Sequence, residues 1–313
     1  MRNSKILFII EEQLQVQVRG YKMTKILDGK EVGQSLRHQA RKDAETLREK
    51  GIHPKLAILR VGEDQASKSY ERNAIRAMKD ATIAVETVTM DESCTEDDVI
   101  TMIEKLNNND LIHGVIIMQP LPEGISRQDI SSYLNPKKDV DGIHPLNLGY
   151  ILEDNRMALL PNTPQAVLEM LAYYEVSLIG KDVAVIGSSP IVGKPLSLML
   201  SNEGATVSNL HIHTKDTRKY TKQADIVISA TGALGLIDET YVKEGAIVLD
   251  VGFGYTDGKI MGDVQYDAVF DKVAAISPVP GGVGSVTTSV LAAQVIKATE
   301  MQARGKLNER FKI

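Results

Sequence analysis

The segment 184–195 joins an apolar run to a turn of small residues. It reads Ala-Val-Ile-Gly-Ser-Ser-Pro-Ile-Val-Gly-Lys-Pro, which predicts a strand, a glycine turn and a helix that starts near Ile191. Backbone N–H groups of such a turn and the positive helix end favour a bound pyrophosphate. The spacing G-x-S-x-x-x-G departs from G-x-G-x-x-G, so a plain tight turn stays open as an alternative. The expected nucleotide contacts are Gly187, Ser188, Ser189, Ile191, Val192 and Gly193.

The end of the next expected strand indicates which nucleotide binds. In many dinucleotide sites an acidic residue about 20 positions after the glycines holds the adenosine ribose. Here residues 210–215 read Leu-His-Ile-His-Thr-Lys, without a carboxylate. His213, Thr214 and the basic groups beside them favour a 2′-phosphate, so the sequence favours NADP over NAD as the cofactor. None of them is the arginine that would bind phosphate in a bidentate manner, and NAD therefore stays open.

Three more glycine turns follow expected strands of the second half. Thr231-Gly232 and Val251-Gly252 end at the same sheet edge, where a nicotinamide ring could approach the backbone, although isolated turns of this kind are more often structural. The loop 278–284, Pro-Val-Pro-Gly-Gly-Val-Gly, is rigid and lies just before a helix. It either contacts a flat ligand or joins two domains. Its candidate substrate contacts are Pro280, Gly281 and Gly282.

The first half carries fewer groups suited to chemistry. Asp139 and Asp141 lie in a turn-rich stretch, where one carboxylate could accept hydrogen bonds from N–H groups of a ligand, or both could simply shape an Asx turn. Tyr70 shares a helix face with alanines and is either a core aromatic or a stacking platform. Gln119 follows a buried strand in a proline-rich loop and could form the lip of a cleft.

Strands and helices alternate along the chain, which predicts an α/β fold with mostly parallel sheets. Turn signals crowd residues 133–165, so this stretch is expected to separate two α/β domains and to line a cleft. After it, Thr163 is expected to cap a helix with Pro164 at its first position. The last helix, over residues 286–299, is expected to be amphipathic and to pack on the first domain.

Composition excludes several classes of protein. A length of 313 residues suits two domains, and 36 basic against 41 acidic residues, a net charge of −5, argue against a nucleic-acid partner. The single Cys94 excludes an intrachain disulfide, accompanies no metal-ligand spacing, and indicates a cytoplasmic setting. The apolar run at residues 6–10 is too short to cross a membrane. Residues 1–22 are expected to be an extension.

Taken in order, these segments resemble the family of methylenetetrahydrofolate dehydrogenase/methenyltetrahydrofolate cyclohydrolases, the FolD family, across residues 24–300. The motifs that carry the resemblance are Val61-Gly62 with Ser67 and Tyr70, Pro120-Leu-Pro122, Lys138-Asp-Val-Asp-Gly142, Val185-Ile-Gly-x-Ser-x-Ile-Val-Gly-x-Pro195, Gly262-Asp263-Val264, and Pro278-Val-Pro-Gly-Gly-Val-Gly284 with Thr287.

The resemblance implies a folate-binding catalytic domain over residues 23–160 and a Rossmann-type NAD(P)-binding domain over residues 161–285. The helix at 286–313 is expected to pack back on the first domain. It further implies tetrahydrofolate derivatives as substrates, an active site in the cleft between the domains, and a homodimer. Tyr70 should stack on the pterin, and Asp141 should bind its amino and ring nitrogens.

Two residues that the resemblance leads one to expect are missing. Ala74 stands where the family has a catalytic lysine, and Met118 stands where it has a glutamine, with Gln119 one position later. Asn162 replaces a frequent cysteine, and neither Ser188 nor Ile212 is a residue that commonly binds the cofactor phosphate. The resemblance therefore implies oxidation of 5,10-methylenetetrahydrofolate, with Tyr70, Asp141 and Gln119 as the candidate catalytic residues. The second activity, cyclohydrolysis, is expected to be weakened or absent.

Two other interpretations stay open. One is a two-domain dehydrogenase acting on an amino or hydroxy acid, in which His144 would be the acid–base group. The other is a non-catalytic paralogue that binds folate or nucleotide, which the missing lysine would suit.

Overall fold

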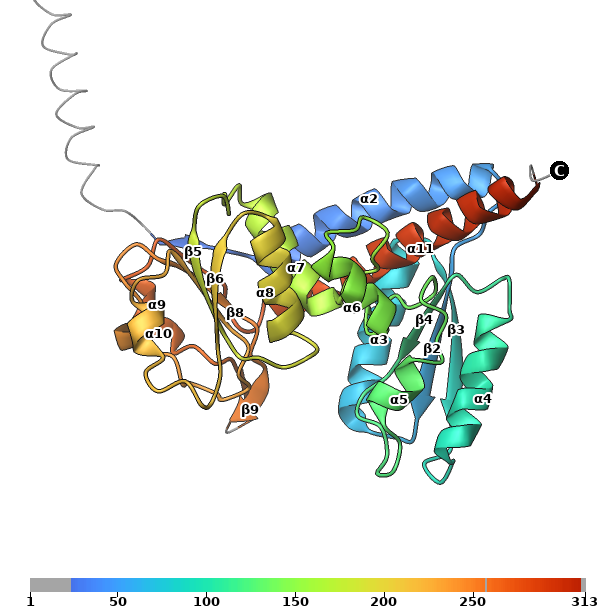
Figure 1. Ribbon diagram of the computed structural model, residues 1–313, viewed down its shortest axis with the longest axis horizontal. Helices are drawn as coiled ribbons and strands as arrows, with labels where there is room; N and C mark the ends of the chain where they lie inside the picture. Colours follow the sequence, from blue (N-terminus) through green and yellow to red (C-terminus); the bar gives the residue numbers. More distant parts are fainter. Residues whose placement is uncertain (1–23, 257, 311–313) are drawn as a thin grey trace, which may run out of the picture.

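The computed structural model describes residues 24–256 and 258–310, with side chains as far as residue 304. The expected extension at residues 1–22 lies outside this range, as do the last three positions of the helix predicted over 286–313. Two α/β lobes lie side by side, and two long helices run from their junction over the top of the lobe drawn on the right (Figure 1). These are α2 (Gly29–Glu49) and α11 (Thr287–Arg310).

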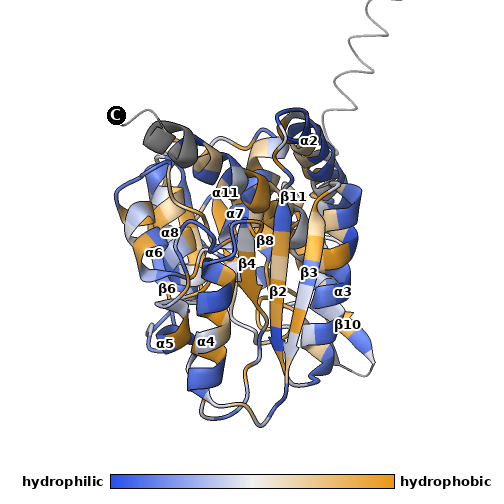
Figure 2. Ribbon diagram, turned by 90° about the vertical axis from the view of Figure 1, so that its right-hand side faces the viewer, coloured by the Kyte–Doolittle hydropathy of each residue, from blue (hydrophilic) through white to orange (hydrophobic). Residues whose placement is uncertain are grey.

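Three parallel strands form the sheet of the first lobe. β2 (Lys55–Val61) lies in the middle, between β3 (Ala84–Met90) and β4 (Gly114–Ile117). β2 is almost fully buried and apolar over most of its length, as expected of a parallel strand covered on both faces (Figure 2). α3 (Gln65–Asp80) leads from β2 to β3, and α4 (Glu96–Asn107) leads from β3 to β4. Since the chain leaves β2 on one side and returns on the other, a crevice is expected outside the carboxyl ends of β2 and β4.

Six parallel strands form the sheet of the second lobe, in the order β1-β11-β8-β7-β5-β6. Along the chain they are β1 (Lys25–Ile26), β5 (Asp182–Ile186), β6 (Thr206–Leu210), β7 (Ile226–Ser229), β8 (Ile247–Asp250) and β11 (Ala275–Ile276). The chain passes from β5 through α8 (Gly193–Asn202) to β6 and then crosses back to β7 on the other side of β5. The strand order therefore reverses between β5 and β7, and this is where a parallel sheet binds its ligand.

The two lobes share their terminal elements. The resemblance implies a first domain over residues 23–160, whereas β1, at residues 25–26, pairs in parallel with β11 of the second sheet. From β1 the chain crosses to the first lobe through α2. It returns at the end in α11, which packs on α2, α3 and β4 and also on α7 (Asn162–Tyr173).

The last helix is buried on more sides than an amphipathic helix would be. Because it packs against α2, α3, β4 and α7 together, polar as well as apolar residues are enclosed, and Thr299 satisfies its hydroxyl by donating to the carbonyl oxygen of Val295 at 2.7 Å. The buried residues of α11 include Ser289, Val290, Leu291, Ala292, Gln294, Val295, Ile296, Ala298 and Thr299.

Two helices begin at other residues than expected. α7 starts at Asn162 after Pro161, without a side-chain cap, so Thr163 does not cap it and Pro164 is its third residue. The Asn162 side chain bonds elsewhere, as described below. α8 starts at Gly193 rather than near Ile191, because Val192 is not helical, with φ −123° and ψ −67°.

The remaining elements are short and lie mostly at the surface. None of the helices among the described residues combines the length and apolar character that a membrane crossing requires. The remaining short elements are α5 (Arg127–Ser131), α6 (Pro145–Leu152), α9 (Arg218–Thr221), the 3-10 turns Glu239–Tyr241 and Val283–Ser285, the hairpin β9 (Gly254–Thr256) and β10 (Lys259–Met261), and α10 (Tyr266–Phe270).

Candidate active site

The glycine turn after β5 is packed too closely for any side chain. Gly187 has φ +118°, and a Cβ there would lie 2.3 Å from the carbonyl oxygen of Ala230, just after β7. A Cβ on Gly193 would lie 1.9 Å from the carbonyl oxygen of Gly187. The turn is thus fixed at the reversal point of the sheet, and its bare backbone suits the close approach of a pyrophosphate.

The helix that follows leaves its first turn open to an anion. No side chain caps α8, and the hydroxyl of Ser189 accepts a hydrogen bond from the N–H of Val192 at 3.1 Å, which holds the turn in shape. Ser188 and Ile191 lie on the same turn, with Ile191 exposed. The turn that the sequence predicts to bind a nucleotide thus leads into a helix without a side-chain cap, an arrangement typical of phosphate sites, and its nucleotide contacts stay a prediction.

The turn at the end of β6 is ordered by its own contacts. The N–H of His211 donates to the hydroxyl of Thr214 at 3.0 Å, and the N–H of His213 donates to Nδ1 of His211 at 3.2 Å. Both imidazole rings are exposed, and their centroids lie 5.8 Å apart. Ile212 is also exposed, so the side chains of this turn are open to solvent.

Two buried carboxylates hold the other glycine turns. Asp263 Oδ2 accepts from the N–H of Thr231 at 2.7 Å, and Asp250 Oδ1 accepts from the N–H of Gly252 at 2.8 Å. Asp250 also accepts from the N–H groups of Asp263 and Val264. Burial raises the pKa of Asp250 to about 6, and the nearby Asp263 adds to this while the backbone hydrogen bonds oppose it. Thr231-Gly232 and Val251-Gly252 therefore form one braced edge beside the nucleotide turn.

The loop 278–284 connects the lobes at the end of β11. The N–H of Gly29, the first residue of α2, donates to the carbonyl oxygen of Gly281 at 2.8 Å. A Cβ on Gly29 would lie 2.0 Å from the carbonyl oxygen of Gly282, and one on Gly282 would lie 2.4 Å from that of Pro278. The loop therefore joins the domains, as one of the two interpretations held, and it leaves Pro280 exposed.

The side chains of Tyr70 and Asp141 lie close enough in the first lobe to interact electrostatically. Tyr70 is half-buried on α3, against the apolar cluster that contains Ala74 and Met118. Burial and the nearby carboxylate of Asp141 raise the pKa of Tyr70, and a hydrogen bond with Thr287 of α11 opposes this. Side chains from α3, from α11 and from the segment between α5 and α6 thus come together.

Asp141 lies in a partly enclosed polar cluster. Nδ2 of Asn162 donates to its Oδ1 at 2.9 Å, and Nη2 of Arg127 lies 3.6 Å from its Oδ2. The Asp141 side chain is 23% exposed. Its pKa rises to about 6, mainly because it is buried; Asp139 adds to the shift, and Arg127 and Asn162 oppose it. The carboxylate is therefore ionised at neutral pH and able to accept N–H groups of a ligand.

The structure separates the roles of the two aspartates. Asp139 is fully buried and accepts from the N–H groups of Ile143 and His144, at 3.2 and 2.8 Å, and from Nδ2 of Asn147 at 2.8 Å. It therefore shapes the turn, while Asp141 faces the cluster. His144 is engaged as well, since its Nδ1 accepts from the N–H of Leu146 and caps α6.

An apolar wall stands where the resemblance leads one to expect a lysine and a glutamine. Ala74 is fully buried and Met118 is 3% exposed. Gln119 is exposed, its side chain forms no hydrogen bond with the described residues, and its carbonyl oxygen accepts from the hydroxyl of Ser67 at 2.7 Å. Arg72 and Arg76, on neighbouring positions of α3, are exposed.

Arg127 is the residue of this cluster that the sequence did not reveal. It begins the five-residue helix α5, within a turn-rich stretch that carries no periodicity, 14 positions before Asp141. Asn162 was noted only as a departure from the family motif. Among residues 24–256 and 258–310, no group of three or more His, Cys, Asp or Glu side chains is placed to hold a metal ion.

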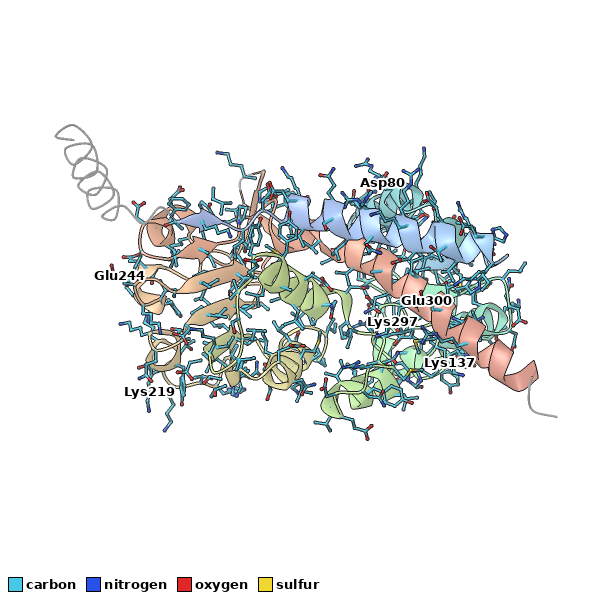
Figure 3. All side chains as sticks on the ribbon, turned by 90° about the horizontal axis from the view of Figure 1, so that it is seen from above. Asp80, Lys137, Lys219, Glu244, Lys297 and Glu300 are labelled. Atoms are coloured by element: carbon cyan, nitrogen blue, oxygen red, sulfur yellow. The ribbon has the colours of Figure 1, made fainter. Side chains whose placement is uncertain are left out.

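A cavity of about 570 Å³ lies apart from these residues. It is bounded by α6, α7 and α8 and by Lys297 of α11, which Figure 3 labels, and contains none of the site residues predicted from the sequence. Lys297 donates to the carbonyl oxygen of Ala158 at 2.7 Å.

Known proteins match both lobes. Residues 27–141 match the tetrahydrofolate dehydrogenase/cyclohydrolase catalytic domain, and residues 161–303 match the NAD(P)-binding domain of the same name. Bifunctional protein FolD of Alkaliphilus metalliredigens is 43% identical over 281 residues, which cover 90% of this chain and 99% of that protein.

Solved structures agree with this match. The bifunctional FolD enzyme of Campylobacter jejuni is 39% identical with a TM-score of 0.88, over 89% of this chain and 99% of that one. The Trypanosoma brucei enzyme, solved with NADP cofactor and an inhibitor, is 31% identical with a TM-score of 0.84, over 90% and 99% of the two chains. The predicted fold, two α/β domains of which the second binds NAD(P), is thus confirmed.

Proposed function

The chain belongs to the tetrahydrofolate dehydrogenase/cyclohydrolase family, and from this premise we propose that it oxidises 5,10-methylenetetrahydrofolate to 5,10-methenyltetrahydrofolate with weakened or absent cyclohydrolase activity. The observation that carries the proposal is the apolar wall of Ala74 and Met118 beside an otherwise polar site at Tyr70 and Asp141.

The dehydrogenase step suits a site without a proton carrier. A folate nitrogen lone pair expels hydride from the methylene carbon and leaves a delocalised amidinium cation, so no side chain has to move a proton. Orientation of two bound reactants is the main requirement, and such proximity is worth about 7–11 kcal/mol. In our proposal Tyr70 stacks on the pterin, Asp141 accepts its N–H groups, and the backbone at Pro280, Gly281 and Gly282 completes the folate site.

The second lobe would hold the nicotinamide cofactor. The turn from Gly187 to Gly193 would bind the pyrophosphate, and the braced turns at Thr231-Gly232 and Val251-Gly252 would lie beside the nicotinamide. A 2′-phosphate at His213 and Thr214 would make NADP the preferred form over NAD. The chemistry that a bound NADP supplies here is acceptance of the hydride by the nicotinamide ring.

Hydrolysis of the methenyl product makes other demands. Water has to be activated for attack on the methenyl carbon, and a well-placed acid–base residue contributes roughly 10²–10⁴ to such a rate. Ala74 and Met118 have no titratable group, and Arg127 stays protonated. This leaves Asp141 as the carboxylate of the cluster that faces the ligand, already engaged by Asn162 and Arg127.

We further propose that the enzyme works as a homodimer in the cytoplasm. The single cysteine, Cys94, is free, which suits a reducing setting.

Separate assays of the two reactions test the proposal. Purified protein is given 5,10-methylenetetrahydrofolate with NADP or NAD, and reduction of the nicotinamide is followed by absorbance. In parallel, decay of 5,10-methenyltetrahydrofolate is followed without cofactor. We expect turnover in the first assay, faster with NADP, and little above the uncatalysed rate in the second. Full cyclohydrolase turnover would refute the proposal that the enzyme keeps the dehydrogenase activity and has a weakened or absent cyclohydrolase activity.

The alternative of a non-catalytic paralogue has its own signature. It predicts tight binding of tetrahydrofolate and nucleotide with no change of nicotinamide absorbance. A dehydrogenase for amino or hydroxy acids is disfavoured, because its acid–base candidate, His144, is occupied as the cap of α6.

A further inference from the structure

Arg127 has few partners for a guanidinium in so enclosed a place. Its side chain is 19% exposed, and its one ion pair within the described part of the chain is with Asp141, 3.6 Å away. It forms no hydrogen bond with another side chain or backbone group of the described residues, and its buried Nε has no partner among them. An arginine that serves the fold normally satisfies several of its five donors. The charge of Arg127 is therefore directed at Asp141 rather than at the scaffold.

The missing lysine would stand on the same face of α3 as Tyr70, whose hydroxyl lies near Asp141. Residue 74 is one helical turn after Tyr70, so the two side chains share a face of α3. The negative charge of Asp141 raises the pKa of the Tyr70 hydroxyl. A lysine at position 74 would thus bring its ammonium toward Asp141 from α3, whereas in this chain the cation reaches it from α5.

We propose that Arg127 replaces the absent lysine as the cation beside Asp141, and that it is a positioning residue that keeps this carboxylate charged and aimed at the N–H groups of the folate. The inference rests on the proposed function. The inference also gives a reason why the enzyme would catalyse the dehydrogenase reaction and not the cyclohydrolase reaction, because a guanidinium provides charge without exchanging a proton. Folate binding and hydride transfer are retained in this way, and water activation is not.

The charged groups around Asp141 make the pH dependence specific. Asp139 of its own loop and Tyr70 of α3 face it, as do Arg127 of α5 and the neutral amide of Asn162 on α7. Of these, Arg127 is the cation that lowers the pKa of Asp141. Without it, the carboxylate would take up a proton at a higher pH.

The test compares R127Q, R127K and wild type by KM for 5,10-methylenetetrahydrofolate, kcat and the pH profile of KM. For R127Q we expect KM to rise about 10-fold, the factor expected when one charge-assisted interaction is lost, with a smaller change in kcat. In the pH profile, KM of R127Q should begin to rise at a higher pH than KM of wild type as the solution is made more acidic. R127K should recover most of the loss, and R76Q, on the exposed side of α3, should behave as wild type.

A rescue variant separates positioning from general damage. A74K in the R127Q background returns a cation to Asp141 from α3, so its KM should fall back toward the wild-type value. Unchanged KM and pH profile in R127Q would overturn the inference, as would a loss that neither R127K nor A74K/R127Q repairs while melting temperatures stay equal.

Calorimetric titration with tetrahydrofolate keeps the two proposals apart. If wild type binds tetrahydrofolate without turnover, the proposed dehydrogenase is wrong, and the ratio of dissociation constants of R127Q and wild type still decides the role of Arg127. If wild type turns over and R127Q binds equally well, the inference alone fails.

Discussion

Asn162 donates a hydrogen bond of 2.9 Å from Nδ2 to Oδ1 of Asp141, and this contact joins the first residue of α7 to the loop that leaves the first lobe. The other amide atom, Oδ1 of Asn162, is buried without a partner among the described residues. The amide nitrogen therefore supports the carboxylate. α7 starts without a side-chain cap because its N-cap residue, Pro161, has no side-chain acceptor.

Replacement of Asn162 by alanine should weaken folate binding. The hydrogen bond favours the ionised form of Asp141, so its loss should raise the pKa of that carboxyl further above 6. We expect KM for 5,10-methylenetetrahydrofolate to rise about 3- to 10-fold at pH 7. As the pH is lowered, KM of N162A should begin to increase at a higher pH than KM of wild type. N108A, at an exposed asparagine after α4, is the control. Equal KM profiles for N162A and wild type would contradict this role.

Restoring the two residues typical of the family should restore cyclohydrolysis. The double variant A74K/M118Q places a titratable ammonium and an amide where the wall now stands. We expect decay of methenyltetrahydrofolate to accelerate by about 10², the low end of general acid–base catalysis. The matched control A74M/M118Q adds similar bulk without a proton carrier and should not accelerate it. A loss of both activities in A74K/M118Q, with an unchanged melting temperature, would count against the alignment at position 74.

Substitution of Gly187 should affect cofactor binding more than folate binding. In G187A the new Cβ would lie 2.3 Å from the carbonyl oxygen of Ala230, so the turn has to move. Displacements of about 1 Å cost roughly 10² in rate, and we expect this factor in kcat/KM for NADP. The control G245A also has positive φ, +74°, but its Cβ meets nothing within 4 Å. It should cost only the backbone strain of about 1–2 kcal/mol in stability.

Stability should depend on the ionisation of Asp141 in a defined pH window. Its pKa of about 6 in the folded state lies above the value near 3.9 of an unfolded aspartate, so the folded state binds the proton more tightly. Its stabilising contribution is therefore complete below pH 4 and is lost as the pH rises through 6. The shift corresponds to up to about 3 kcal/mol between these limits.

Denaturant unfolding of D141N and wild type from pH 4 to 7 measures this contribution. The difference in unfolding free energy between them should change in favour of D141N as the pH rises. D91N is the control, because hydrogen bonds from Ser93 lower the pKa of Asp91. The contribution of that carboxyl is nearly constant above pH 5 and is lost only below about pH 4, so D91N and wild type should run nearly parallel through pH 5 to 7. Parallel curves for D141N and wild type would mean that the carboxyl titrates normally.

Local patterns in the sequence were sufficient for the central strands and the nucleotide turn. A buried parallel strand is an apolar run whatever surrounds it, and Gly187 ends such a run, so β5 and its turn were predictable. The start of α8 was not, because the non-helical backbone of Val192 and the close approach of Gly193 to Gly187 are features that no local pattern indicates. Residues 25–26 carry no periodicity, and only pairing with β11 makes them a strand.

The site was predictable as a set of segments and not as a set of contacts. Asp139 and Asp141 are two positions apart in one turn, and only the folded chain shows that the first accepts hydrogen bonds from its own loop while the second faces Asn162 and Arg127. Arg127, at the start of α5, comes within 3.6 Å of Asp141, which lies 14 positions later between α5 and α6, and no sequence spacing indicates this contact.

Since β1 completes the second sheet before α2 crosses over, and α11 returns between α2 and α3, neither lobe is a continuous stretch of polypeptide. A fragment ending near residue 160 would lose the partner of β1 and the helix that shields α2 and α3. A fragment starting there would lack an edge strand and the anchor at Gly29. Unfolding of one half therefore exposes the core of the other, and the whole molecule should melt as a single cooperative unit.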